Sequence, residues 1–265
     1  MPVAEGWKFR DINEGTLSLL INRELWFSNP SFFNDPFDCQ IDIDGSFKSV
    51  EDEIENHWPD DLEAFKEGVK LHHTEHGYGY FCLCQDWQQS LMWSHYANEH
   101  KGIALGFTFD VASELDITQL ERNEIIYKTD AFKDAIRSLS GSFNMMKANP
   151  LSRPGLMAGE AQGFQRNFRQ NWMDFYEIIR HMKSECWEYE KEIRYELELA
   201  SKDQVGVARR FSPNDLKHIV FGIRCDKRKI DTIRNLLNSD DWSHLRYWQA
   251  KPDPVNLVVK TQELT

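Results

Sequence analysis

Alternation of apolar and polar residues is clearest between Trp187 and Leu199, in the run WEYEKEIRYELEL. The odd positions carry mostly apolar side chains, and the even positions carry five glutamates and one arginine. Because successive side chains of a strand point to opposite faces, the run predicts a β-strand with one core face and one acidic face. Carboxylates at i and i+2 lie roughly 6–7 Å apart and repel one another, so neutralising Glu192 is expected to raise stability slightly.

Shorter apolar runs predict further strands, and 3.6-residue periodicity predicts helices between them. The expected strands cover residues 7–10, 24–28, 80–85, 102–107, 218–222, 245–249 and 256–260. A helix is expected after Asn13, others over 88–98 and 227–238, and a mostly helical stretch over 130–184. Strands and helices mix without a regular βαβ rhythm, which indicates an α+β fold. We expect one domain over residues 1–265, with the helical stretch as an insertion.

Composition and charge exclude several classes of protein. The net charge of −12 disfavours nonspecific binding to duplex nucleic acid. No run approaches 18 apolar residues and no signal peptide precedes the first strand, so a cytoplasmic protein that does not enter a membrane is expected. The five cysteines form no CxxC motif, and no metal site is predicted from them. GxGxxG, P-loop and GxSxG motifs are absent from the sequence.

Two clusters outside the acidic run carry side chains suited to binding. The segment 29–38 reads as a loop, yet it holds three phenylalanines together with Asn34, Asp35 and Asp38. We expect these short polar side chains to stiffen the loop, its phenylalanines to pack inward, and the loop to border the site. In the helix over 88–98, Trp93 and Tyr96 share one face, which is either core or a stacking wall, and His95 is offset from it.

The acidic face itself allows two interpretations. It is either the solvated outer face of an antiparallel sheet or a carboxylate-lined active site on Glu190 and Glu192. Arg194, on the same face, would keep these carboxylates charged.

Four segments of the chain resemble the bacterial and phage family called domain of unknown function 2971. They are LWFSNPSFFNDPFD over 25–38, LMWSHYA over 91–97 with Gly102, WEYEKEIR over 187–194, and FSP over 211–213 with IVFG over 219–222. This resemblance implies a family and no activity.

A second resemblance is to ADP-ribosyltransferases, including the DNA-modifying toxins. Their fold begins strand–helix–strand, with an arginine or histidine on the first strand, an aromatic-serine pair on the second, and Glu-x-Glu on a late strand. Arg10, Phe27-Ser28 and Glu190-x-Glu192 follow that order here. The resemblance implies a bent or split mixed sheet with NAD as the substrate.

The same resemblance assigns roles to single residues. Glu192 would hold a ribose hydroxyl and stabilise the positive charge that develops when the nicotinamide–ribose bond breaks. Arg10 would clamp the diphosphate, Glu190 would deprotonate the acceptor, and Ser28 would hydrogen-bond Glu192. The remaining residues expected to contact the dinucleotide are Asn34, Asp35, Trp93, His95, Tyr96 and Arg194. Arg10, Ser28 and Glu192 should therefore converge on one cleft.

Two other functions remain open at this point. A metal-dependent nuclease could use hard oxygen ligands and one imidazole, supplied by Asp35, Asp38, His95, Glu190 and Glu192. A ligand-sensing or partner-binding module of a phage-defence system would need no catalysis. If the chain is a transferase, acting as a toxin or defence effector, its acceptor is a protein, a nucleic acid or water.

Overall fold

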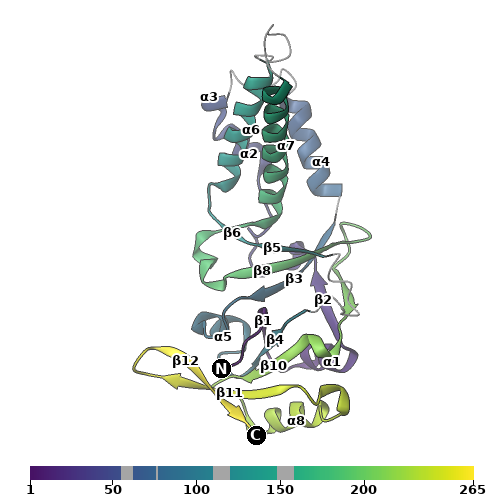
Figure 1. Ribbon diagram of the computed structural model, residues 1–265, viewed down its shortest axis with the longest axis vertical. Helices are drawn as coiled ribbons and strands as arrows, with labels where there is room; N and C mark the ends of the chain where they lie inside the picture. Colours follow the sequence, from purple (N-terminus) through teal and green to yellow (C-terminus); the bar gives the residue numbers. More distant parts are fainter. Residues whose placement is uncertain (55–61, 76, 110–119, 148–157) are drawn as a thin grey trace. The chain divides into compact units, whose positions relative to one another are not determined.

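The computed structural model describes residues 1–54, 62–75, 77–109, 120–147 and 158–265 (Figure 1). The chain divides into two compact units, each made of separate segments. Unit 1 comprises Met1–Asn29, Tyr78–Glu124 and Trp187–Thr265, and unit 2 comprises Pro30–Gly77 and Ile125–Cys186. The combination of a large mixed sheet with several helices confirms the α+β class.

Unit 1 is built on one mixed β-sheet. Its strands are β1 (Gly6–Arg10), β2 (Glu24–Ser28), β3 (Tyr78–Cys84), β4 (Ile103–Phe107), β5 (Glu121–Glu124), β8 (Glu192–Glu198), β9 (Gly206–Arg210), β10 (Leu216–Phe221), β11 (Arg246–Asp253) and β12 (Val258–Leu264). The order is β12-β11-β10-β4-β1-β3-β2-β9, and β8 pairs with both β3 and β5. The β10–β11 pair is parallel and the other pairs are antiparallel.

The sheet is weakly joined at two seams. Among the described residues, a single pair, Trp7 with Cys84, joins β1 to β3, and a single pair, Ser28 with Tyr80, joins β2 to β3. By contrast, β3 and β8 pair over seven residues, and β1 and β4 over five. The sheet therefore consists of three well-paired blocks, with β3–β8–β5 between the other two.

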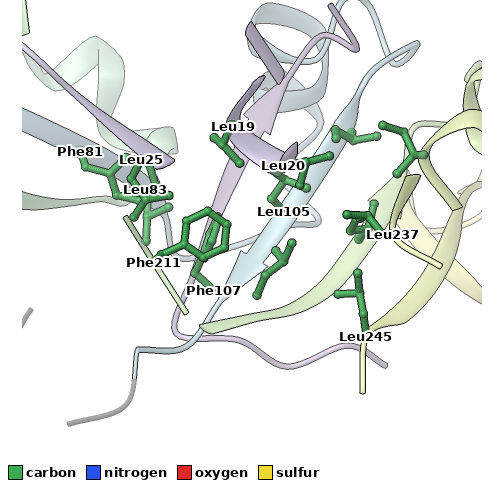
Figure 2. Close-up of a cluster of buried hydrophobic side chains, with 14 of the residues drawn as sticks. Leu19, Leu20, Leu25, Phe81, Leu83, Leu105, Phe107, Phe211, Leu237 and Leu245 are labelled. Atoms are coloured by element: carbon green, nitrogen blue, oxygen red, sulfur yellow. The ribbon is translucent and has the colours of Figure 1, made fainter. Parts of the chain in front are cut away.

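Apolar side chains cover both faces of this sheet. Leu19 and Leu20 from α1 (Glu14–Asn22) pack with Leu105 and Phe107 of β4 on one face (Figure 2). Helix α8 (Lys227–Leu236) also lies on this core, which Leu245 extends. On the other face, α5 (Ser90–Tyr96) packs against β1 and β4. Full burial of each large apolar side chain contributes about 1.5–3 kcal/mol, so both helix layers hold the strands in place.

Unit 2 is mostly helical. It contains α2 (Ile43–Lys48), α3 (Glu51–Ile54), α4 (Leu62–Glu75), α6 (Ala131–Lys147) and α7 (Ala158–His181), with a short 3₁₀ helix, η1 (Pro30–Phe32). Its core is aromatic, with Phe47, Phe132 and Phe175 in mutual contact. A parallel pair, β6 (Ile126–Tyr127) with β7 (Met182–Lys183), lies at the ends of the helical segment. The stretch 130–184, expected to be mostly helical, holds α6 and α7.

The strand predicted from Trp187 begins five residues later than the alternation suggests. Residues Glu185–Glu190 form a 3₁₀ helix, η4, and β8 starts at Glu192. Between them Lys191 has a φ of 42°, in the left-handed region that strands exclude. The alternation of apolar and polar residues before Glu192 therefore does not reflect a strand, and successive side chains point to opposite faces of a strand only from Glu192 onward.

Candidate active site

Glu192 and Arg194 form a buried ion pair at the start of β8. They lie two residues apart on one face of the strand, and Nε of Arg194 donates to Oε1 of Glu192 at 2.8 Å, while Nη2 lies 3.3 Å from Oε2. Arg194 is fully buried and its guanidinium lies 5.4 Å from the centre of the Tyr80 ring. A two-pronged contact of this kind fixes the orientation of the carboxylate and favours its ionised form.

Lys8 of β1 enters the seam between β1 and β3. Its Nζ donates to the backbone carbonyl of Cys82 at 2.9 Å and lies 5.1 Å from the centre of the Phe81 ring. Burial lowers the pKa of the Lys8 ammonium, and the negative charges of Glu192 and Glu190 act in the opposite direction. Lys8 therefore lies within electrostatic reach of both glutamates.

Glu190 reaches the same region from the end of η4. Tyr96, on α5, donates its phenolic hydrogen to Oε1 of Glu190 at 2.6 Å. Because Lys191 adopts a left-handed conformation, Glu190 and Glu192 are both buried although they do not belong to one strand. The predicted i, i+2 spacing of these two carboxylates along a strand is thus wrong.

The alternative of a solvated outer face is also wrong for the first half of β8. Glu190, Glu192, Arg194 and Glu196 are all buried, and Glu198 is exposed. Cys82 lies opposite Arg194 on β3, and burial, followed by the charge of Glu192, raises the pKa of its thiol. This is a polar cluster inside the protein, and a raised thiol pKa makes Cys82 a poor nucleophile.

Arg10 and Ser28 have local partners. Nε of Arg10 donates to Oγ1 of Thr16 in α1 at 2.9 Å, and burial lowers the pKa of the guanidinium. The Ser28 hydroxyl donates to the carbonyl of Asn29 at 3.4 Å, and Ser28 pairs with Tyr80 of β3. Both residues belong to unit 1 with Glu192, and the charge of Arg10 acts on Lys8.

The three candidate residues of α5, Trp93, His95 and Tyr96, differ in exposure, and Tyr96 is half-buried. Trp93 is fully buried, contacts the Phe9 ring edge-on at 5.1 Å, and donates its indole hydrogen to the carbonyl of Trp87 at 2.7 Å. This is the core role that the sequence left open for it. His95 is exposed, and its ring lies 6.1 Å from that of Tyr189.

The loop that holds Asn34, Asp35 and Asp38 belongs to unit 2. Asp35 is buried and accepts from the backbone of Phe37 at 3.0 Å, and Asp38 is buried in an ion pair with Lys183 at 3.2 Å. Asn34 is exposed. The prediction that the phenylalanines pack inward is wrong for two of them, because Phe32 and Phe37 are 57% and 79% exposed.

Two further results concern metals and membranes. Within the described residues, no group of three His, Cys, Asp or Glu side chains is arranged to hold a metal ion. The nuclease alternative therefore gains no support from this part of the chain. None of the helices in the described ranges has the length and apolar character needed to cross a membrane.

The sequence assigned no role to Lys8 or Tyr80, and it did not predict the polar surroundings of Cys82 or the exposure of Trp26 on β2. The signal for Lys8 was a charged residue placed between two large aromatic residues, Trp7 and Phe9, in a strand. For β2, the aromatic-serine pair drew attention to Phe27, whereas alternation puts Leu25 and Phe27 in the core and Trp26 outside.

Comparison with known protein families gives a match over the middle of the chain. Residues 92–195 match the profile of a family described as protein of unknown function (DUF2971). The match extends from α5 to β8 and includes both Tyr96 and Glu192. No curated protein and no solved structure matched the chain.

Proposed function

We propose that this protein, whose residues 92–195 match the DUF2971 family profile, is an ADP-ribosyltransferase-like enzyme with NAD as its substrate. It would transfer ADP-ribose to an acceptor or, with water as acceptor, hydrolyse NAD. The observation that carries the proposal is the Glu192 carboxylate, fixed by Arg194 beside a seam of the sheet that also holds Lys8.

The order of elements supports this assignment. Arg10 ends β1, α1 follows, Ser28 ends β2, and Glu192 begins a late strand that pairs with β3. This order resembles the strand–helix–strand start and late glutamate expected of an ADP-ribosyltransferase, and it supports the proposal. The weak β1–β3 and β2–β3 junctions are the feature expected of a split sheet.

The chemistry requires a fixed negative charge near a breaking glycosidic bond. The bond between ribose C1 and the nicotinamide nitrogen breaks, its electron pair leaves with nicotinamide, and positive charge develops on the ribose. Glu192 would hold a ribose hydroxyl and stabilise that charge, which Arg194 helps by keeping the carboxylate ionised. A nucleophilic atom of the acceptor then forms a bond to C1 and gives its proton to Glu190. Arg10 would bind the diphosphate through its guanidinium.

The test is release of nicotinamide from NAD by the purified protein in the absence of added metal, followed by chromatography. Glu192→Gln should lower the rate about a hundred-fold or more, because removing one electrostatic group of this kind costs about 3–4 kcal/mol of transition-state stabilisation. Glu198→Gln, at the exposed end of the same strand, is the matched control and should keep the wild-type rate. Glu190→Gln should lose transfer to an acceptor more than hydrolysis by water.

Other results would identify the other functions. Wild-type protein that neither binds nor consumes NAD, with or without candidate acceptors, would favour the non-enzymatic module. Activity on nucleic acid that depends on added magnesium or manganese would favour the nuclease. Circular dichroism of each variant separates loss of chemistry from loss of fold.

A further inference from the structure

Trp26 is a large aromatic side chain displayed on the surface of β2. It is 46% exposed, whereas Leu25 and Phe27 on either side of it are completely buried. Alternation along the strand places Trp26 on the same face as Glu24 and Ser28.

A glycine of the neighbouring strand, Gly206 of β9, leaves room for the Trp26 ring. A methyl group added at Gly206 of β9 would come within 2.7 Å of both Cε2 and Cζ2 of the Trp26 indole. The ring therefore lies over the bare backbone of Gly206, which fixes its position, and the remainder of the ring is open to solvent. A fixed aromatic ring with an open side is a surface on which a planar heterocycle stacks.

Charged side chains of both signs lie beside this ring. Arg210 of β9 is directly opposite Glu24 of β2, and Trp26 is directly opposite Ala208, so all four residues share one face. Arg210 is exposed. A guanidinium matches phosphate oxygens, and a carboxylate accepts hydrogen bonds from ribose hydroxyls. The indole of Trp26 could therefore stack on a base, the guanidinium of Arg210 could bind a phosphate, and the carboxylate of Glu24 could accept hydrogen bonds from a ribose.

The sheet register gives the distance to Glu192. Ser28 pairs with Tyr80, and Tyr80 pairs with Glu196, so β2 and β8 lie two strand spacings apart, on the order of 10 Å. Trp26 and Glu192 are displaced from this row in the same direction, by two and four residues. A diphosphate-bridged dinucleotide is long enough to contact both residues at once.

We propose that Trp26, with Arg210 and Glu24, forms the subsite for the adenosine phosphate half of NAD. This inference rests on the proposed NAD-dependent function. In the bound state adenine stacks on the indole, its ribose hydroxyls donate to Glu24, and the adjacent phosphate accepts from Arg210. The nicotinamide half then extends toward Glu192.

The experiment measures binding of AMP, ADP-ribose and nicotinamide mononucleotide to the full chain by calorimetry. Trp26→Leu should weaken AMP and ADP-ribose about tenfold or more, because a stacked base depends on the ring beneath it, and should leave nicotinamide mononucleotide unchanged. Trp26→Phe, which keeps a ring, should retain most of the affinity. Leu257→Ser, at another exposed apolar side chain of unit 1, is the control and should bind like the wild type.

The outcomes separate this inference from the proposed function. Wild-type protein that binds neither AMP nor ADP-ribose overturns the subsite, as does a Trp26→Leu variant of unchanged affinity, whose ring then serves only to cover Gly206. If AMP binds through Trp26 but no nicotinamide is released, the transferase fails and the nucleotide subsite stands. If nicotinamide is released and Trp26→Leu keeps the wild-type KM for NAD, the subsite fails and the transferase stands.

Discussion

Tyr96 donates a hydrogen bond of 2.6 Å to Glu190, a residue 94 positions further along the chain. The bond joins α5 to the end of η4, so it holds the segment that leads into β8 against the helix on that face of the sheet. Glu190 is buried, and a buried carboxylate needs donors of this kind to remain charged.

The first prediction removes this donor. Tyr96→Phe keeps the ring and should lower the free energy of unfolding by about 1.5–3 kcal/mol, since the hydrogen bond is made to a charged group. Urea unfolding at pH 7 measures the change. Ser94→Ala, at an exposed position of the same helix, should stay within about 0.5 kcal/mol of the wild type. Equal effects of the two substitutions would show that the bond does not stabilise the fold.

The second prediction concerns the effect of neutralising Glu192 on the free energy of unfolding, and it is opposite in sign to the effect expected from the sequence. Neutralising it was expected to relieve repulsion, but Glu192 is paired with buried Arg194, so Glu192→Gln removes a charged partner from a buried guanidinium. Glu192→Gln and Arg194→Met should each cost about 3–5 kcal/mol in unfolding free energy. The double variant should lose less than the sum of the two, because the interaction between Glu192 and Arg194 is then lost only once. Strictly additive losses in urea unfolding would contradict a direct pair.

The third prediction concerns His218 in β10. Its ring stacks 6.1 Å from that of Trp7, accepts at Nδ1 from the Trp248 indole at 3.3 Å, and therefore carries its hydrogen on Nε2, toward the carbonyl of Val3. Burial lowers the pKa of His218 below 6.5. The unfolded chain thus binds the proton more readily, and stability falls as the pH decreases through and below about 6.5.

Thermal unfolding between pH 5 and pH 8 measures this loss. The contribution of His218 should be at most about 1.4 kcal/mol per pH unit, and His218→Gln should remove it. His95→Gln, at an exposed histidine of unit 1, should leave the profile as in the wild type. A His218→Gln profile parallel to that of the wild type would contradict the assignment.

The fourth prediction assigns a structural role to Asp38 in unit 2. Asp38 and Lys183 are both buried and paired at 3.2 Å, so Asp38→Asn, which removes a charged partner from the buried ammonium, should cost about 3–5 kcal/mol. Asp130→Asn, which breaks the exposed pair of Asp130 with Lys133, should cost much less. Both can be compared by hydrogen exchange of unit 2 amides. Similar protection in the two variants would contradict the role of Asp38.

Sequence alone predicted what depends on local pattern. The α+β class, the positions of most strands, and the family resemblance through LMWSHYA and WEYEKEIR all follow from short stretches of residues. It failed where one residue departs from regular geometry, as at Lys191, whose left-handed conformation ends the apparent alternation. It also could not distinguish a buried acidic face from a solvated one, because burial of Glu192 depends on partners such as Arg194 and on covering residues distant in the chain.

The division of both units into separate segments affects the order in which the chain can fold. Residues of unit 2 end at Cys186, whereas β2 pairs with β9, which extends to Arg210. The ribosome synthesises the chain from the N-terminus, so the helices of unit 2 can pack before β9, the strand that pairs with β2 at Leu25 and Phe27, has been synthesised. Packing of unit 2 brings Pro30 and Cys186 into one compact body, which shortens the effective loop between β2 and β9 and lowers the entropy cost of pairing them. Unit 2 is thus expected to act as an internal aid to the folding of unit 1.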